Sequence, residues 1–304
     1  MVLSALLVPS IAIERSSAWW SWLASFRPGT VEHAEGVLRA SPPVDDEIVL
    51  IGSSVSVVDV IDEPLGRALG RPVTVAGMMA APVCATAMLA PELVARRPRT
   101  LVYVVAPRDL ERCQPRTRNP FDLDIALHAI GPWEIVRDED WLAAAVSDTS
   151  ALVRHRGVFQ MLGHSGAPGW RFHPRHGGRV SDAALAVGIA RRAPRLRAAT
   201  YDGTGPSARA LARLATRLRE VGTEVVLVPA PVVPALVEAS TGEVGTAWHR
   251  DAVADVARVA AALELRHVTP EALGEYSSED FRDPMHLGPS GQIRYTRALA
   301  EALR

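Results

Sequence analysis

The chain has 304 residues, of which 48% are hydrophobic and 22% are charged, as is typical of a folded globular protein. Its 33 basic and 34 acidic residues give a formal net charge of −1, which excludes the strongly basic composition of many nucleic-acid-binding domains. Lys does not occur, a bias typical of GC-rich bacterial genomes, so a lysine nucleophile or Schiff base is excluded.

The first 43 residues are predicted to form a separate N-terminal segment. Residues 1–13 are uncharged and mostly apolar, but a membrane-spanning helix needs about 20 such residues. No Lys or Arg precedes them, so the charged start of a signal peptide is missing. A Trp-rich stretch at 19–23 leads into 27–43, where Pro-Gly and Ser-Pro-Pro indicate a connector. We favour an N-terminal helix packed on the main domain.

A membrane-associated segment is the alternative for these residues, because tryptophans favour headgroup depth. The two cysteines, Cys84 and Cys113, form no C-x-x-C or zinc-finger pattern and do not identify a redox compartment. Both the cell envelope and the cytoplasm therefore stay open as locations, as does the oligomeric state.

Residues 44–304 are predicted to form one α/β domain in which strands and helices alternate. The expected elements, in chain order, are strand Glu47–Gly52, strand Val73–Gly77, helix Pro82–Arg96, strand Thr100–Val105, helix Ser207–Val221, strand Glu224–Val228, helix Trp248–Leu263, strand Leu265–Val268 and helix Ser290–Leu303. This alternation predicts a mostly parallel, doubly wound sheet. Residues 111–206 interrupt it with a stretch far longer than an ordinary crossover, and we interpret them as a cap or lid inserted after the third strand.

Two short polar motifs indicate a catalytic site. The first strand ends in Gly52-Ser53-Ser54, and ligands of open α/β sheets bind at the carboxyl ends of the strands. Asp283 and His286 stand three residues apart on a turn before the last helix. Serine is a poor nucleophile until a base activates it and a third group orients that base. An imidazole held by Asp283 meets this need for one of the two serines.

These motifs, together with a glycine after the second strand, resemble those of the SGNH/GDSL hydrolase superfamily. The Gly-Ser-Ser sequence is most similar to the branches of D-alanyl transfer proteins and polysaccharide O-acetyltransferases. The resemblance implies a flavodoxin-like three-layer α/β/α sandwich and acyl-ester chemistry. It further implies that Ser54 is the nucleophile, with Ser53 as second choice, and that His286 and Asp283 are the base and the acid of a triad.

The resemblance also implies an oxyanion hole, built from the N–H groups of Ser54 and Gly77. The third family block reads Gly-x-Asn-Asp, whereas this chain has Ala106-Pro107-Arg108-Asp109. Arg108 therefore stands where the family places a side-chain amide donor, and loss of one such donor costs about 3 kcal/mol in the transition state. Either Arg108 replaces that donor, or the hole is weaker, or catalysis is lost. Asp109 is expected to support the site without touching substrate.

The predicted function is a serine-dependent acyl-ester hydrolase or O-acyltransferase acting on an acylated carbohydrate or a small ester, without a cofactor. The alternative is a carbohydrate-binding or assembly protein of the same fold that has lost turnover. No metal site is expected, because His164, His173 and His176 have no Cys, Asp or Glu nearby in sequence. A nucleotide site at 203–208 is disfavoured, because Pro206 lacks a phosphate-facing N–H.

Overall fold

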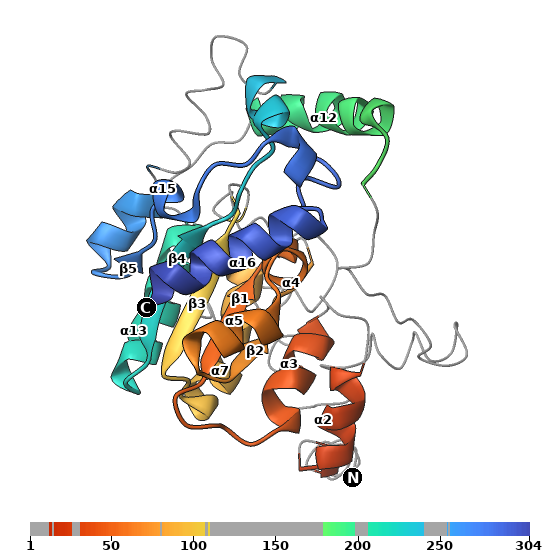
Figure 1. The fold of residues 1–304 in the computed structure, drawn as a ribbon. Helices are drawn as coiled ribbons and strands as arrows, with labels where there is room; N and C mark the ends of the chain where they lie inside the picture. The colour runs from red at the N-terminus through yellow and green to blue at the C-terminus, as the bar shows by residue number, and fades with distance from the viewer. Residues whose placement is uncertain are drawn as a thin grey trace, which may run out of the picture.

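Among the described residues, five parallel strands form one sheet. The computed structural model describes residues 12–13, 15–25, 31–79, 81–106, 109, 179–197, 206–239, 254 and 256–304. The strands are β1 Ile48–Gly52, β2 Val73–Val75, β3 Thr100–Val105, β4 Glu224–Pro229 and β5 Arg266–His267 (Figure 1). Their order across the sheet, β2-β1-β3-β4-β5, is the flavodoxin-like strand order. The predicted fold class, a three-layer α/β/α sandwich, is therefore confirmed.

Helices cover both faces of the sheet, and the central strands β1 and β3 are buried along their whole length. In β1, Val49 and Ile51 pack into one core while Ile48 and Leu50 pack into the other, as the alternation of side chains along a strand requires. The first core includes residues of α3 Val31–Ala40, α6 Val83–Thr86, η1 Ala87–Leu89, α7 Ala90–Arg96 and α13 Pro206–Glu220. The second includes residues of α4 Ser54–Val58, α5 Asp62–Leu69, α12 Asp182–Arg197, α15 Pro270–Leu273 and α16 Pro289–Leu303. The 3₁₀ turn η3 spans Ser278–Asp280.

The interpretation of residues 27–43 as a connector is wrong for its central part, which forms α3. Ala34 and Leu38 lie on one face of α3 and are buried. Gly36 lets α3 approach α2 Ser17–Ala24 closely, because a Cβ there would lie 2.3 Å from the Ala24 nitrogen. In the sequence, Pro and Gly at both flanks favoured a connector over a helix with a short apolar face. Tertiary packing on α2 and α7 stabilises the helix.

The helix predicted over Pro82–Arg96 is also interrupted. It consists of α6, the 3₁₀ turn η1 and α7. Pro91 lies in the first turn of α7 and has no N–H to donate to the preceding turn, so a continuous α-helix through this point is disfavoured. Of the helix predicted at Trp248–Leu263, residues 256–262 are helical and the preceding residues lie mostly outside the described part.

The N-terminal and inserted segments are only partly within the described residues. In α2, Trp20 and Leu23 are buried against neighbouring aromatic side chains. Within the described ranges, no helix is both long and apolar enough to cross a membrane. Of the predicted insertion at 111–206, residues 179–197 are described, and α12 lies at the end of the molecule opposite α2 and α3 (Figure 1). The predicted domain boundaries at 43/44 and 111–206 remain predictions.

A buried ion pair anchors α7 and α3 to the amino end of the sheet. The Arg96 guanidinium donates to both carboxylate oxygens of Glu47, at 2.7 and 2.8 Å, and the two side chains are 2% and 1% exposed. It also donates to the carbonyl oxygens of Leu38, in the last turn of α3, and of Ser41, just after its end. Removing one partner of such a pair leaves the charge of the other buried and unpaired.

We expect Arg96→Met to lower the free energy of unfolding by about 3–5 kcal/mol, because it leaves the Glu47 carboxylate unpaired. Arg67 provides the control, since its pair with Glu63 is 71% and 78% exposed, and Arg67→Met should cost no more than about 0.5 kcal/mol. Urea unfolding of both variants measures the difference. Equal losses would show that the buried pair contributes no more than a surface pair.

Candidate active site

The turn after β1 is built around Gly52. Its φ is +138°, and a Cβ there would lie 2.3 Å from the Val104 carbonyl oxygen, so both backbone conformation and space require glycine. The chain then enters α4, which begins at Ser54. Ser53 occupies the N-cap position with its side chain buried, and its carbonyl oxygen accepts hydrogen bonds from the backbone N–H and Oγ of Ser56. The Ser54 side chain is half-buried at the carboxyl end of β1.

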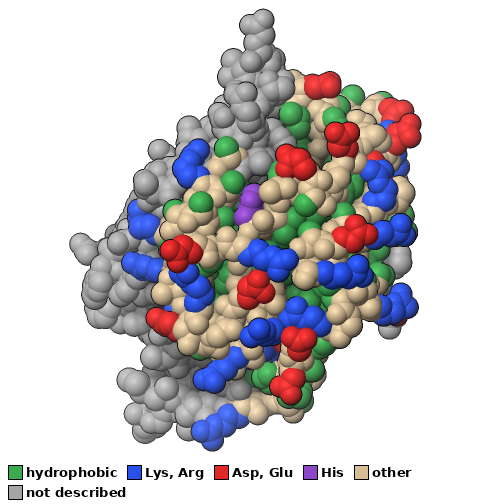
Figure 2. Space-filling view, turned by 60° about the vertical axis from the view of Figure 1, so that its left-hand side comes forward, with side chains coloured by type: hydrophobic (Ala, Val, Ile, Leu, Met, Phe, Trp, Pro, Cys, Tyr) green, Lys and Arg blue, Asp and Glu red, His purple; other side chains and the backbone are tan. Residues whose placement is uncertain are grey.

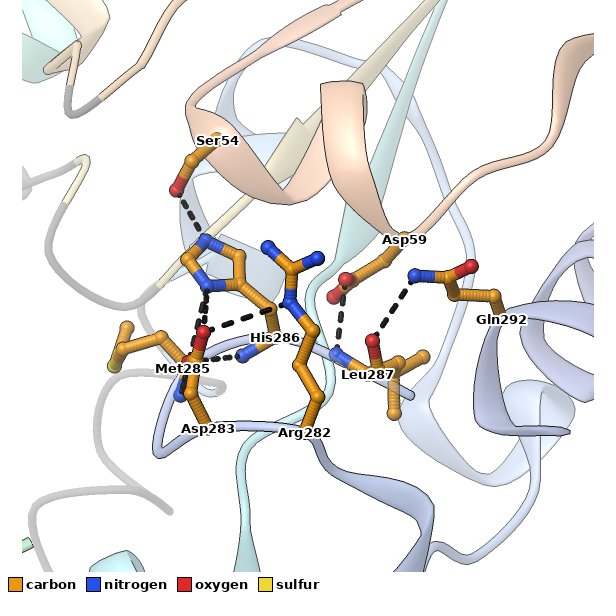
Figure 3. Close-up of polar contacts among 8 residues, drawn as sticks. All are labelled: Ser54, Asp59, Arg282, Asp283, Met285, His286, Leu287 and Gln292. Carbon is orange, nitrogen blue, oxygen red and sulfur yellow. Dashed lines mark hydrogen bonds and ion pairs between the residues drawn. The ribbon is translucent and has the colours of Figure 1, made fainter. Parts of the chain in front are cut away.

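The second motif forms the turn between η3 and α16, and its side chains face Ser54. His286 Nε2 lies 2.8 Å from Ser54 Oγ. On the far side of the ring, Nδ1 lies 3.0 and 2.9 Å from the two carboxylate oxygens of Asp283. Figure 3 shows the three side chains in a row, with the imidazole between the hydroxyl and the carboxylate. The structure thus brings together the three residues that the sequence motifs predicted as a triad.

The Asp283 carboxylate is held by backbone as well as by the ring. The N–H groups of Met285 and His286 donate to its Oδ1 at 2.8 and 3.0 Å, and Arg282 Nε lies 3.6 Å from its Oδ2. Burial raises the pKa of Asp283, but the His286 hydrogen bond and charge, the Met285 N–H and the Arg282 charge outweigh it and lower the pKa to about 2. The carboxylate is therefore anionic at neutral pH.

This arrangement decides which ring nitrogen of neutral His286 carries the proton. A carboxylate only accepts hydrogen bonds, so Nδ1 carries the hydrogen that faces Asp283. Nε2 then presents its lone pair to Ser54 Oγ. The Ser54 hydroxyl can therefore donate to Nε2, while the Asp283 carboxylate fixes the tautomer of the imidazole. This arrangement of hydroxyl, base and anion is the one that activates serine nucleophiles.

The predicted oxyanion residues lie beside this site where the structure describes them. Gly77 follows β2 and packs on α4, where a Cβ would lie 2.0 Å from Ser56 Oγ, so the position has no room for a side chain. The next N–H, of Met78, donates to the Gly52 carbonyl oxygen at 2.9 Å and joins this segment to the nucleophile turn. Arg108 lies outside the described residues. Asp109 is buried and accepts from the Ala106 N–H at 2.8 Å, which stabilises the turn at the end of β3.

Contact of α12 with the Asp283–His286 turn was not predicted from the sequence. Gly188 of α12 packs on Pro284, where a Cβ would lie 2.7 Å from Pro284 Cγ. The Val180 N–H donates to the Arg282 carbonyl oxygen at 2.9 Å. Part of the predicted insertion therefore supports the turn that carries the histidine. No local signal identified this contact, because the glycine lies in an Ala-rich helix more than ninety residues before its partner.

We expect Gly188→Ala to lower by about tenfold the kcat of any reaction in which His286 acts as a base, since relieving the 2.7 Å approach displaces the Pro284 turn by a fraction of an ångström. The neighbouring Val187 is 69% exposed, so Val187→Ala is the control and should leave kcat unchanged. Steady-state kinetics of both variants test the contact. An unchanged kcat in Gly188→Ala would mean that α12 does not hold the turn in place.

No metal cluster is found in the part of the chain that the structure describes, and the histidines at 164, 173 and 176 lie outside it. On the face drawn in Figure 2, acidic and basic side chains are interspersed over the coloured surface, and neither sign forms a continuous patch there.

No protein-family model and no curated protein sequence matches the chain. Similar solved structures include a GDSL-like lipase from Bacteroides thetaiotaomicron, with 10% identity, a TM-score of 0.40 and coverage of 95% of this chain and 98% of that one. A putative acylhydrolase from Bacteroides fragilis has 9% identity and a TM-score of 0.42, over 90% of this chain and 93% of that one.

A carbohydrate acetylesterase family member from Sinorhizobium meliloti has 10% identity and a TM-score of 0.39, over 85% of this chain and 97% of that one. Similarity at this level, with TM-scores below 0.5, carries neither the activity nor the substrate of those proteins to the present chain.

Proposed function

We propose that the chain is an SGNH/GDSL-type hydrolase of acyl esters that uses Ser54, His286 and Asp283 as a catalytic triad. The observation that supports this most strongly is the continuous contact from Ser54 Oγ through the His286 ring to Asp283, at 2.8 and 2.9 Å. The three residues come from two segments that are 232 positions apart in sequence. A hydrogen bond with a purely structural role would not need an imidazole placed between a hydroxyl and a carboxylate.

The reaction follows from the orientation of these groups. Ser54 Oγ attacks the carbonyl carbon of the ester while His286 Nε2 takes the hydroxyl proton, and Asp283 stabilises the imidazolium that forms. The tetrahedral intermediate collapses, the C–O bond to the alcohol breaks, and Nε2 returns its proton to that alcohol. Water then attacks the acyl-serine carbonyl and gives a proton to Nε2. The bond between the acyl carbon and Ser54 Oγ breaks, Nε2 returns that proton to Oγ, and the carboxylic acid leaves. We assign the oxyanion contacts to the N–H groups of Ser54 and Gly77, with Arg108 as a further donor.

An O-acyltransferase uses the same first half of this cycle. The acyl-serine is then attacked by a sugar hydroxyl instead of water, and the acyl group passes to the carbohydrate. We propose an acylated carbohydrate or a small ester as substrate. The choice between water and a sugar depends on how the residues around the site exclude water, which involves the predicted insertion at 111–206.

Hydrolysis of p-nitrophenyl acetate by the purified chain tests the proposal. We expect acetate and p-nitrophenol to be released in equal amounts by the hydrolase. Addition of mono- or oligosaccharides should divert acetate to a sugar ester if the chain is a transferase. A folded protein that releases no p-nitrophenol above the buffer rate, from acetyl or longer acyl esters, contradicts both forms of the proposal.

A further inference from the structure

Asp59 is a buried carboxyl that the catalytic cycle does not use. It is the C-cap residue of α4, the short helix that begins at Ser54, and it is 0% exposed. Its Oδ1 accepts the backbone N–H of Leu287, the residue after His286, at 2.9 Å. Its Oδ2 is buried and has no hydrogen-bond partner among the described residues. One side chain thus links the helix of the nucleophile to the turn of the base (Figure 3).

The Leu287 peptide is held from its other side as well. Gln292 of α16 is buried, and its Nε2 donates to the Leu287 carbonyl oxygen at 3.0 Å. Leu287 also forms an isolated antiparallel bridge with Phe281. The backbone next to His286 is therefore fixed to α16 by Gln292 and to α4 by Asp59. Of these two contacts, only that of Asp59 reaches α4, the helix that carries Ser54.

Burial of Asp59 has an energetic cost that an apolar residue would avoid. An acidic side chain with a partner for only one of its oxygens loses solvation that one hydrogen bond does not replace. Burial raises the pKa of Asp59 well above its ordinary value, against the opposing effect of the Leu287 N–H, and the negative charge of Asp283 raises it further while Arg282 lowers it. Packing alone gives no reason for a carboxyl at this position.

We propose that Asp59 is a positioning residue that sets the distance between Ser54 and His286 by holding the Leu287 N–H from the end of α4. This inference rests on the proposed function of Ser54 and His286. What the site requires of residue 59 is an acceptor of the right reach, and neither a charge nor a transferable proton. A misplacement of about 1 Å between reacting groups lowers rates by about 100-fold.

Asp59→Asn and Asp59→Leu separate the acceptor from the charge. Asparagine keeps an oxygen that accepts the Leu287 N–H, whereas leucine has the same branching at Cγ and no acceptor. We expect Asp59→Leu to lower both kcat for p-nitrophenyl acetate and the rate constant of fluorophosphonate labelling by about 10- to 100-fold. KM should change little, because residue 59 is fully buried and does not touch substrate. Asp59→Asn should keep both rates within about threefold of wild type.

Thr296→Val is the matched control. Thr296 is buried, and its Oγ1 accepts the N–H of Ile61 at 3.0 Å, two residues beyond Asp59. Its loss removes a side-chain-to-backbone bond of the same kind that does not involve the turn of His286. We expect Thr296→Val to lower the melting temperature and to leave kcat unchanged. Equal kcat losses in Thr296→Val and Asp59→Leu would reduce the role of Asp59 to general stability and overturn the proposal.

The other possible results also test the role of Asp59. Wild-type activity in Asp59→Leu, or a loss in Asp59→Asn as large as that in Asp59→Leu, contradicts the role of an acceptor.

If Asp59→Leu does not fold, hydrogen exchange at the Leu287 amide of the wild-type protein replaces it. Protection of this amide is expected, and exchange at the rate of an exposed amide overturns the proposal. If wild type itself neither turns over esters nor reacts with fluorophosphonate, the proposed function has failed, whereas an active wild type with an unaffected Asp59→Leu variant rejects the role of Asp59 alone.

Discussion

Replacement of Ser54 by alanine is expected to lower acyl-ester turnover by about 10⁴-fold or more, because it removes the only atom that forms the acyl-enzyme bond in the proposed cycle. Its Oγ is the hydroxyl oxygen 2.8 Å from the base. Steady-state hydrolysis of p-nitrophenyl acetate by matched preparations measures the loss. Circular dichroism and the melting temperature should stay close to wild type, since the side chain is half-buried and lies at a helix start.

Ser53→Ala is the control for this prediction. Ser53 is buried at the N-cap of α4, yet its side chain makes no capping hydrogen bond, so alanine removes little local stabilisation. We expect this variant to retain turnover within about threefold of wild type. If Ser53→Ala loses turnover while Ser54→Ala keeps it, the second-choice serine is the nucleophile and the assignment of Ser54 is wrong.

Asp283→Asn is expected to reduce kcat by about 10⁴-fold while the protein stays folded. The amide NH₂ of asparagine can face His286 Nδ1 in place of a carboxylate oxygen, which favours the tautomer with hydrogen on Nε2. That tautomer has no lone pair for the Ser54 hydroxyl. Parallel kinetics and thermal unfolding separate this effect from misfolding. A kcat within about tenfold of wild type would show that the carboxylate does not orient the base.

The same variant carries a prediction about pH. The pKa of Asp283 falls from 3.8 in the unfolded chain to about 2 in the folded protein. The stabilisation of about 2 kcal/mol that this shift represents is present above pH 3.8 and disappears as pH falls through about 2. The difference in unfolding free energy between wild type and Asp283→Asn should therefore shrink on acidification through this window. A difference that stays constant between neutral pH and about pH 2.5 contradicts it.

Sequence patterns predicted the sheet because each strand carries its own local signal. The predicted strand Thr100–Val105 matches β3 at both ends. An unbroken run of β-branched and apolar residues that is short for a helix favours a buried strand. The start of α13 and the left-handed glycine at 222 that follows it agree within one residue with the predicted helix and its stop. The flavodoxin-like strand arrangement was implied by the family resemblance, because the handedness of crossover connections does not by itself fix which strands pair.

The central residues of the candidate site were also accessible from sequence, because the resemblance supplies their order along the chain. Ser54 lies at the end of β1 and His286 precedes α16, as the motifs predicted. The contacts that support them were not accessible. Asp59 meets Leu287 across 228 positions, and the only sequence signal was a single acidic residue within an apolar run. The packing of Gly188 on Pro284 likewise depends on tertiary structure.

Fluorophosphonate labelling tests the nucleophile most directly, because the reagent forms a stable adduct only with an activated serine. The purified chain should gain one adduct, and peptide mass spectrometry should place it on Ser54. Ser54→Ala should gain none, and Ser53→Ala should still be labelled at Ser54. A folded wild-type protein that remains unlabelled, or that carries the adduct on another residue, would contradict the triad and favour a carbohydrate-binding or assembly protein without turnover.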